Sequence, residues 1–336
     1  MERSRKTIFI SAVVAAATIA TAILLYESFR RNATARASPA PDLLAALPPG
    51  APTLAYLDLA AVRASSFFQH RPDKGPIVLP NQDYAEFVAS TGFDFEKDLD
   101  RVVVASWPAS GKEQRKNVVI ADGRFDQAKI RDYAKRKGRV DHLQGHDVFL
   151  FPTGDRKGFN SVSFLDRHRV AIVEGPNIVP LFAGHSDDTP ADPARERAAR
   201  LDGAAAFAIT RVPPVPDNFG PDGAQSAELA SLARSVEWVT LAARPEGDNL
   251  RISLEGECDN SSDALQVKSA LELLRMFGLA GLDIPKTRES MDPATLAMLQ
   301  TLFSSAEVTQ AAKRVRILIE VTPDVWHLSG PAKRQQ

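Results

Sequence analysis

Four segments in the first half of this 336-residue chain are matched, in the same order, by four segments in the second half. The matched pairs are residues 52–62 with 204–215, 99–108 with 236–245, 117–126 with 250–259, and 169–184 with 314–330. Each segment contains an apolar stretch of the kind that forms strands, and the third pair aligns Gly123 with Gly256 ahead of a helical stretch. This ordered match predicts that the chain contains two copies of one unit.

Each copy has the predicted element order strand, helix, strand, strand, helix, strand. That order resembles the split βαβ or ferredoxin-like arrangement. The sequence therefore predicts an α+β fold of two repeated βαββαβ units with mainly antiparallel sheets, and residues 147–152 and 160–166 add a predicted hairpin to the first copy. The predicted boundaries are a cytoplasmic tail and transmembrane signal anchor (1–37), a Pro-rich spacer (38–50), the first repeat (51–185), a linker (186–200), the second repeat (201–330) and a tail (331–336).

A run of twenty residues without a charge, 7–26, stands near the N-terminus. As a helix it would rise about 30 Å, which is the thickness of the hydrocarbon core of a bilayer. A secretory signal has a shorter apolar region followed closely by a cleavage site, whereas Glu27, Arg30 and Arg31 precede the candidate site at 33–37. We expect an uncleaved anchor in contact with the lipid bilayer, and a cleaved signal is the alternative.

The orientation of this anchor is predicted from the short N-terminal tail, because the basic residues on its two sides are balanced. A short tail before a first apolar segment stays in the cytoplasm more often than not. The prediction is a single-pass protein of the bacterial inner membrane with its C-terminal domain outside the cytoplasm, in the periplasm.

The charge and cysteine content exclude several classes of protein. The formal net charge is −1, and a nucleic-acid binder would show a basic excess or a basic face. The basic residues between 129 and 139 are diluted by acids and fit a solvated helix face. Cys258 is the single cysteine, so the chain has neither an internal disulfide nor a Cys-based zinc site, and its acidic neighbours disfavour a thiolate.

The stretch "NVVIADGRFD" (117–126) places a glycine between a predicted strand and a predicted helix, a position at which many enzymes bind phosphate. However, no G-x-G-x-x-G pattern surrounds Gly123, and acids surround Gly256 in the second copy. We expect Gly123 to let the chain turn into its helix, and the sequence predicts no cofactor.

The candidate metal ligands are His142 and His146, with Asp141 and Asp147 beside them in "DHLQGHD". Imidazole and carboxylate groups can together hold zinc, but a four-residue spacing puts two ligands on one face only in a helix. Gly145 indicates a turn, and two exposed turn histidines are the simpler interpretation. No catalytic motif such as G-x-S-x-G, H-E-x-x-H or S-x-x-K occurs, and the sequence assigns no catalytic, cofactor-binding or metal-binding residue beyond these candidates.

Two further segments, 225–238 and 292–307, have amphipathic helical spacing. Asp292 before Pro293 is a good helix start. Each apolar stripe would pack against a sheet or occupy the groove of a partner.

An N-terminal anchor, "LPPGAPTLAYLDLAAVRAS" (47–65) and "GRFD" (123–126) together resemble bacterial membrane-anchored envelope proteins that are grouped as domains of unknown function. That family has no assigned catalytic residues, so the resemblance implies an envelope location and no site. The leading hypothesis is a non-enzymatic envelope protein that binds a protein partner or organises an assembly. The alternatives are an envelope hydrolase with a His/Asp site in the first repeat, and a sensor that binds a small ligand in the cleft between the repeats.

Overall fold

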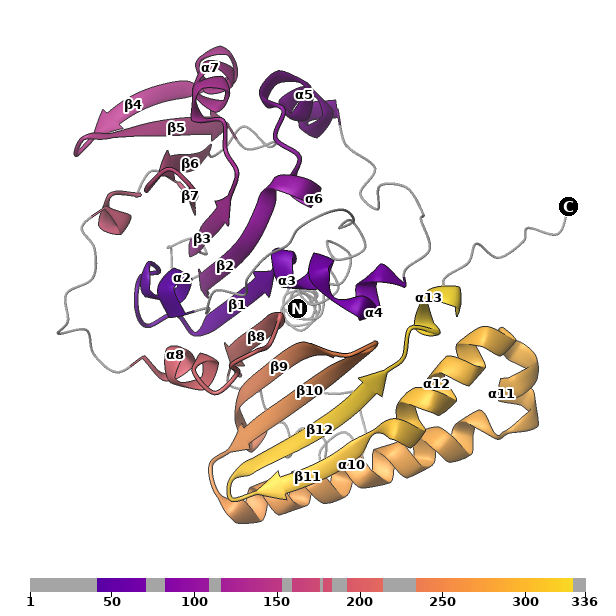
Figure 1. The fold of residues 1–336 in the computed structure, drawn as a ribbon. Coiled ribbons are helices and arrows are strands. Elements are labelled where there is room, and N and C mark those ends of the chain that lie inside the picture. The colour runs from indigo at the N-terminus through magenta and orange to yellow at the C-terminus, as the bar shows by residue number, and fades with distance from the viewer. Residues whose placement is uncertain are drawn as a thin grey trace, which may run out of the picture. The chain divides into compact units, whose positions relative to one another are not determined.

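The computed structural model describes residues 41–70, 82–108, 116–152, 159–175, 178–182, 192–213 and 234–328 (Figure 1). The chain divides into two compact units. Unit 1 comprises the residues up to Ala64 together with Asp73–Glu196, and unit 2 comprises Ser65–Pro72 together with Arg197 and the residues after it. The predicted anchor at 7–26 lies outside the described residues. Among the helices that are described, none is long and apolar enough to cross a membrane.

Unit 1 is built on a sheet of seven strands in the order β1-β2-β3-β7-β6-β5-β4. The strands are β1 (Thr53–Asp58), β2 (Leu99–Trp107), β3 (Lys116–Gly123), β4 (Arg139–Leu143), β5 (His146–Pro152), β6 (Phe159–Phe164) and β7 (Arg169–Glu174). The helices are α2 (Pro41–Ala45), α3 (Leu59–Ala64), α5 (Gln82–Thr91), α6 (Phe95–Asp98), α7 (Gln127–Lys137) and the 3-10 turn η1 (Val179–Leu181), and α8 (Pro193–Ala198) begins in unit 1 and ends in unit 2.

One part of the core of unit 1 lies on a single face of this sheet. Residues directly opposite each other in antiparallel strands point to the same face, and two successive rows across β1, β2, β3 and β7 are apolar and buried. The rows are Leu54, Ala105, Val118, Val173 and Tyr56, Val103, Ile120, Ala171. The strict alternation of buried and half-buried residues along β1 is the period of two expected of a strand with one buried face.

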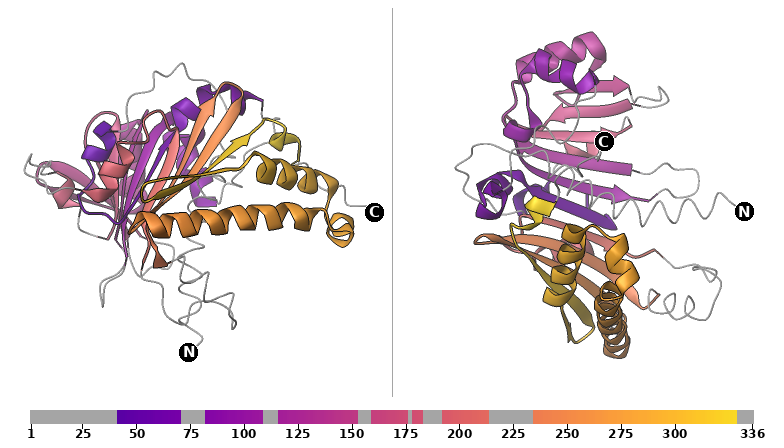
Figure 2. Two further views of the ribbon diagram at one scale, coloured as in Figure 1. Left: turned by 90° about the horizontal axis from the view of Figure 1, so that it is seen from below. Right: turned by 90° about the vertical axis from the view of Figure 1, so that its right-hand side faces the viewer.

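Unit 2 has five strands in the order β8-β9-β10-β12-β11. They are β8 (Ala206–Arg211), β9 (Val236–Glu246), β10 (Asn249–Cys258), β11 (Glu307–Ala311) and β12 (Arg314–Val321), and the helices are α4 (Ser66–Gln69), α10 (Ser261–Leu282), α11 (Pro285–Ser290), α12 (Pro293–Ser305) and α13 (Val325–Leu328). Figure 2 shows α10 as one long straight helix, with α12 running back beside it after α11. Cys258, Ala264 and Val315 form the buried cluster at which the first half of α10 packs against the sheet.

The predicted ferredoxin-like or split βαβ topology is wrong. A βαβ unit needs two parallel strands joined by a crossover, whereas every pairing between the named strands of either unit is antiparallel, including β1 with β2, β3 with β7 and β8 with β9. Because β1 and β2 are antiparallel neighbours, the chain between them leaves and re-enters the sheet at the same end. The helices there are an excursion from one end of the sheet, which the element order by itself does not reveal.

Other expectations have mixed outcomes. The hairpin predicted at 147–152 and 160–166 is confirmed as β5 and β6. Residues 41–45, within the predicted spacer, form α2, and Leu43 of this helix and Leu47 just after it are completely buried. Residues 236–238, predicted to be helical, begin strand β9, and the rest of that predicted helix up to 233 lies outside the described residues. The internal duplication stays a prediction.

Candidate functional site

The candidate metal ligands of the sequence are placed on a hairpin between β4 and β5. His142 lies opposite Asp147, and Leu143 lies opposite His146, so His142 and His146 are on opposite faces of the sheet. Gln144 and Gly145 form the two-residue turn, both with positive φ. His142 Nδ1 is 3.1 Å from Asp147 Oδ1, whereas the ring of His146 stacks on Phe182 with centroids 4.2 Å apart.

This geometry does not bring the four candidate residues to one point. Asp141 shares the face of His146 and carries an ion pair with Arg139. Asp147 is also 2.9 Å from Arg131, and the bond to His142 and the charge of Arg131 hold the pKa of Asp147 below its usual value. Over the described ranges as a whole, no group of three or more His, Cys, Asp or Glu side chains is arranged to hold a metal ion.

Gly123 ends strand β3, as the sequence predicted. A Cβ atom at this position would come within 2.5 Å of the carbonyl oxygen of Asp98, so the chain requires glycine here. The amides that a phosphate would need are already used, because Gly123 donates to the His168 carbonyl and Arg124 to that of Asp98. The Asp126 side chain accepts from the Lys129 amide and so begins α7.

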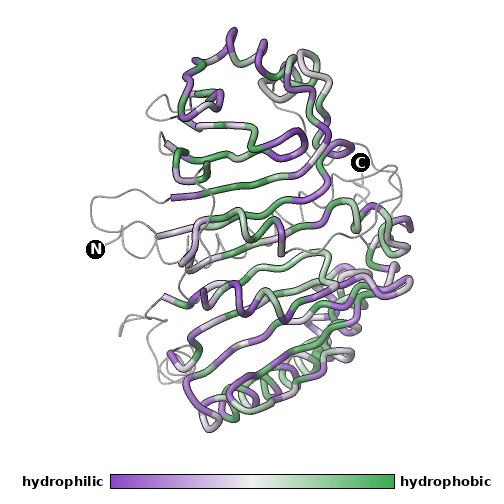
Figure 3. Tube along the Cα trace, turned by 60° about the vertical axis from the view of Figure 1, so that its left-hand side comes forward, coloured by the Kyte–Doolittle hydropathy of each residue, from purple (hydrophilic) through white to green (hydrophobic). Residues whose placement is uncertain are grey.

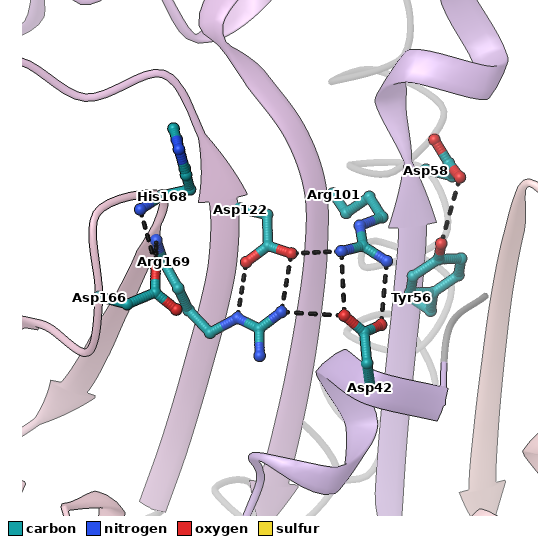
Figure 4. Close-up of polar contacts among 8 residues, drawn as sticks. All are labelled: Asp42, Tyr56, Asp58, Arg101, Asp122, Asp166, His168 and Arg169. Atoms are coloured by element: carbon teal, nitrogen blue, oxygen red, sulfur yellow. Dashed lines mark hydrogen bonds and ion pairs between the residues drawn. The ribbon is translucent and has the colours of Figure 1, made fainter. Parts of the chain in front are cut away.

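A row of alternating charges crosses four strands of unit 1 (Figure 4). The row is Asp58, Arg101, Asp122 and Arg169, each opposite the next. One carboxylate oxygen of Asp122 accepts a hydrogen bond from Arg101 at 2.5 Å, and the other accepts one from the Nε of Arg169 at 2.7 Å. Both arginines also reach Asp42 of α2, at 3.0 and 3.1 Å. The row therefore fastens α2 to the sheet.

This row is balanced within itself. Burial raises the pKa of Asp42, but the hydrogen bonds and charges of Arg101 and Arg169 outweigh it, and the pKa is lowered overall. Burial is also the main reason that the pKa of Asp58 is raised. Asp58 accepts from the Ala61 amide at 2.7 Å and from the Tyr56 hydroxyl at 3.3 Å. These bonds give each charged group of the row a partner within the fold. We therefore interpret the row as a structural feature and not as a binding or catalytic site.

The sharpest departure from an ordinary protein surface lies on α10. Leu265, Leu273, Leu274 and Met276 leave between 47% and 54% of their surface exposed, and Phe277 leaves 69%. At 3.6 residues per turn these five positions cover roughly half of the helix circumference. The buried and packed positions Ala264, Val267, Leu271 and Leu282 lie on the opposite side. We call the five exposed residues the α10 surface.

The second half of α10 presents most of this surface. Four of its five residues fall between 273 and 277, and Ile284, which precedes α11, is 52% exposed beside them in the chain. The helix is held by α12, since Gly278 lies directly against the ring of Phe303. Hydrophobic residues recur around α10 in Figure 3. A helix that is apolar on its covered side and again on its open side lacks the polar face of an ordinary surface helix.

The sequence predicts an apolar stripe through Leu265, Leu271, Leu274 and Phe277, but sequence reasoning did not show that most of it stays exposed. The stretch "LELLRMFGLAGL" (271–282) contains Glu272 and Arg275 as its charged residues. One helical stripe contains about half of the apolar residues of this stretch. The other apolar residues point away from that stripe, so packing against one sheet cannot bury them all.

Neither a family model nor a curated protein matches this sequence. Among solved structures, crystal form III of TP0453 is similar over 87% of this chain and 98% of its own, with 10% identity and a TM-score of 0.47. Crystal form I of TP0453 is similar over 89% and 100%, with 11% identity and a TM-score of 0.41. Scores of this size are too low to establish a shared fold or function.

Proposed function

We propose that this protein is a non-enzymatic, membrane-anchored protein of the bacterial cell envelope, and that unit 2 holds a protein partner through the α10 surface. The observation that carries the proposal is the exposure of five large apolar side chains on one helix. Large exposed apolar patches on a soluble domain mark interaction sites. The anchor predicted at 7–26 and the resemblance to envelope proteins support the location.

The energetic argument is simple. Complete burial of a Leu, Met or Phe side chain contributes about 1.5–3 kcal/mol, so covering the exposed half of five such side chains would contribute roughly 5 kcal/mol. Leu273, Met276 and Phe277 have the i, i+3, i+4 spacing with which a helix fills an apolar groove. A partner protein with such a groove would gain most of its affinity from these anchors.

The charges beside the α10 surface favour a protein over an anionic bilayer as the partner. Lys268 pairs with Glu272 at 3.0 Å, and Arg288 pairs with Asp283 at 2.7 Å. A helix that lies on an anionic membrane carries mainly Lys and Arg on its polar side, whereas a balanced polar rim around an apolar centre is the usual anatomy of a protein interface.

The proposal assigns no reaction to the chain. The hydrolase alternative depends on His142 and His146, which lie on opposite faces of one hairpin. The sensor alternative concerns a cleft between the repeats, and no observation within either unit favours it.

The test is site-specific photocross-linking of the full-length chain in its own cells. A photoreactive amino acid at position 274 or 277 should give one adduct with a single protein of constant mass, and the same amino acid at Lys129 of α7 should not. Phe277→Asp should abolish the adduct formed from position 274. Adducts at twice the mass of the chain would show that a second copy covers α10, and cross-links to lipid alone would show that a membrane does. Either result overturns the proposal, as does equal capture from position 129.

The location has its own test, which is protease digestion of a C-terminally tagged chain in spheroplasts. Loss of the tagged full-length band without lysis is expected. Protection until lysis would place the domain in the cytoplasm.

A further inference from the structure

Seven charged side chains gather on the face of the unit 2 sheet opposite α10. Glu255 and Glu257 lie on β10 opposite Arg316 and Arg314 of β12, whereas Cys258 and Val315 point the other way, toward α10. The two carboxylates stand among five cations, Arg197, Arg200, Lys313, Arg314 and Arg316. Five positive charges against two negative leave an excess of three, and we call these seven residues the arginine cluster.

The inner part of the cluster is tightly bonded. Glu257 is buried, and its Oε1 lies 2.9 Å from Arg197 and 2.9 Å from Lys313. The guanidinium of Arg197 also lies 4.2 Å from the ring centre of Trp238. Arg316 donates to Oε2 of Glu255 at 2.6 Å. These bonds fix the two carboxylates in place.

The outer part is open. The Nη2 of Arg200 lies 3.9 Å from Oε1 of Glu255 and 3.5 Å from Oε2 of Glu257, and the Nη1 of Arg314 lies 3.8 Å from the same Oε1 of Glu255. These separations exceed those of N–H···O hydrogen bonds. Among the residues that the structure describes, neither guanidinium donates a hydrogen bond. Arg200 is 43% exposed and Arg314 is 37% exposed, so their donors face solvent beside one carboxylate oxygen.

We propose that the arginine cluster binds a phosphate group, with Arg200 and Arg314 contacting its oxygens. A guanidinium offers a planar fork of donors that fits phosphate oxygens two at a time. Two forks that come from different segments, one after α8 and one on β12, approach the same point from two directions. That arrangement suits a tetrahedral group with several oxygens, and the charge excess suits a phosphate monoester. The inference is independent of the proposed partner site, since it concerns the opposite face of the sheet.

The phosphate could belong to a soluble phosphomonoester or to a lipid headgroup, and the experiment distinguishes these sources. The full-length chain in a neutral detergent is titrated calorimetrically with glycerol 3-phosphate and separately with the short-chain lipid dihexanoylphosphatidic acid. Binding of at least one probe is expected. Comparable affinities would mean that the phosphate alone is recognised, and much tighter binding of the lipid would identify the headgroup as the ligand.

The variant Arg200→Gln/Arg314→Gln should weaken binding about tenfold or more, because each lost charge-assisted pair is worth that much. Arg200→Lys keeps the charge and loses the fork, so it should also weaken binding. The matched control is Arg251→Gln. Arg251 lies on β10, the strand that carries Glu255 and Glu257, and pairs with Glu246 at 2.9 Å. Its affinity should stay within about twofold of the parent chain.

Thermal unfolding of the double variant should match that of the parent chain, because its two arginines are partly exposed and loosely held. Three results overturn the proposal. They are no binding of either phosphate probe, an equal loss of affinity in Arg251→Gln, and binding of acetate as tight as that of glycerol 3-phosphate.

Discussion

Charged side chains are arranged differently on the sheets of units 1 and 2. In unit 1 one row of alternating charge crosses β1, β2, β3 and β7, and the next row, from Tyr56 to Ala171, is apolar and buried. In unit 2 the strands β8, β9, β10 and β12 are successive neighbours in the sheet. Their rows are Arg211, Trp238, Glu257, Arg314 and Ile209, Thr240, Glu255, Arg316. Charges thus occupy both rows, and the arginines beside them exceed the carboxylates.

The same contrast holds for apolar surface. The large apolar side chains that stay exposed, as far as the structure describes them, all belong to unit 2, and most lie on α10. In unit 1 the row of alternating charge and the buried apolar rows are paired within the unit. This difference fits the two proposals above, which place an apolar and a basic binding surface on unit 2.

The largest expected effect separates a core phenylalanine from an exposed one. Phe149 of β5 is fully buried and its ring meets Phe164 at 6.0 Å, so Phe149→Ala should cost about 3–5 kcal/mol of the free energy of unfolding. Phe277→Ala on α10 should cost less than about 0.5 kcal/mol, because it removes exposed surface. The free energy of unfolding of both variants is measured by urea titration, with hydrogen exchange of peptides from each unit as the readout. A large loss for Phe277→Ala would show that α10 is covered in the isolated chain.

The second comparison removes one carboxylate from each unit. Asp122→Ala should cost about 3 kcal/mol, because it leaves Arg101 and Arg169 with an unbalanced charge in a site where Asp122 is only 11% exposed. Glu272→Ala removes an exposed i, i+4 pair with Lys268 and should cost a few tenths of a kcal/mol. Equal losses in urea titrations would contradict the view that the charge row of unit 1 fastens the scaffold.

The third concerns pH. The pKa of Asp42 is lowered in the folded chain, so the stability it contributes is present above its unfolded value near 3.9 and is lost as pH falls through the lower folded pKa. Asp42 is 48% exposed, and solvent screening limits the effect to about 1 kcal/mol. Between pH 5 and pH 3 the parent chain should therefore lose more stability than Asp42→Asn. If the stability of both proteins changes with pH in the same way, Asp42 does not stabilise the fold through its ion pairs.

The smallest effect distinguishes two glycines of α10. A Cβ at Gly281 would meet nothing within 4 Å, whereas at Gly278 it would come within 2.8 Å of the Phe303 ring. Gly281→Ala should stabilise the chain by about 0.5–1 kcal/mol through helix propensity. Gly278→Ala should gain less, because Phe303 must move. Thermal unfolding of the two variants decides, and an equal gain would mean that α12 packs loosely against α10.

Several elements were predictable from local sequence because local chemistry decides them. Asp292 was predicted to begin a helix, and its carboxylate accepts from the Thr295 amide at 2.8 Å. The helix after Gly256 is capped by Asn260, which accepts from the Asp263 amide at 3.0 Å, although Ser261, Ser262 and Asp263 are equally suitable residue types for a cap. A run of four possible capping residues does not show where the helix begins.

The candidate site was less predictable, because it depends on which residues meet across strands. His142 and His146 are close in sequence and lie on opposite faces of a sheet. Arg200 and Arg314 are far apart in sequence and approach the same carboxylate oxygen. Spacing along the chain cannot predict such a contact unless the register of the strands is already known.

The sequence by itself determined where strands and helices begin and end at Gly123, Asp292 and the β5–β6 hairpin, because propensity, capping and turn chemistry act over a few residues. The tertiary structure alone decided the order of the strands in each sheet, the balance of charge in unit 1 and its excess in unit 2. It also decided which side of α10 stays exposed. Those properties arise from pairings between distant segments. A helix with apolar residues on every side does not show from its own sequence which side will pack against the sheet.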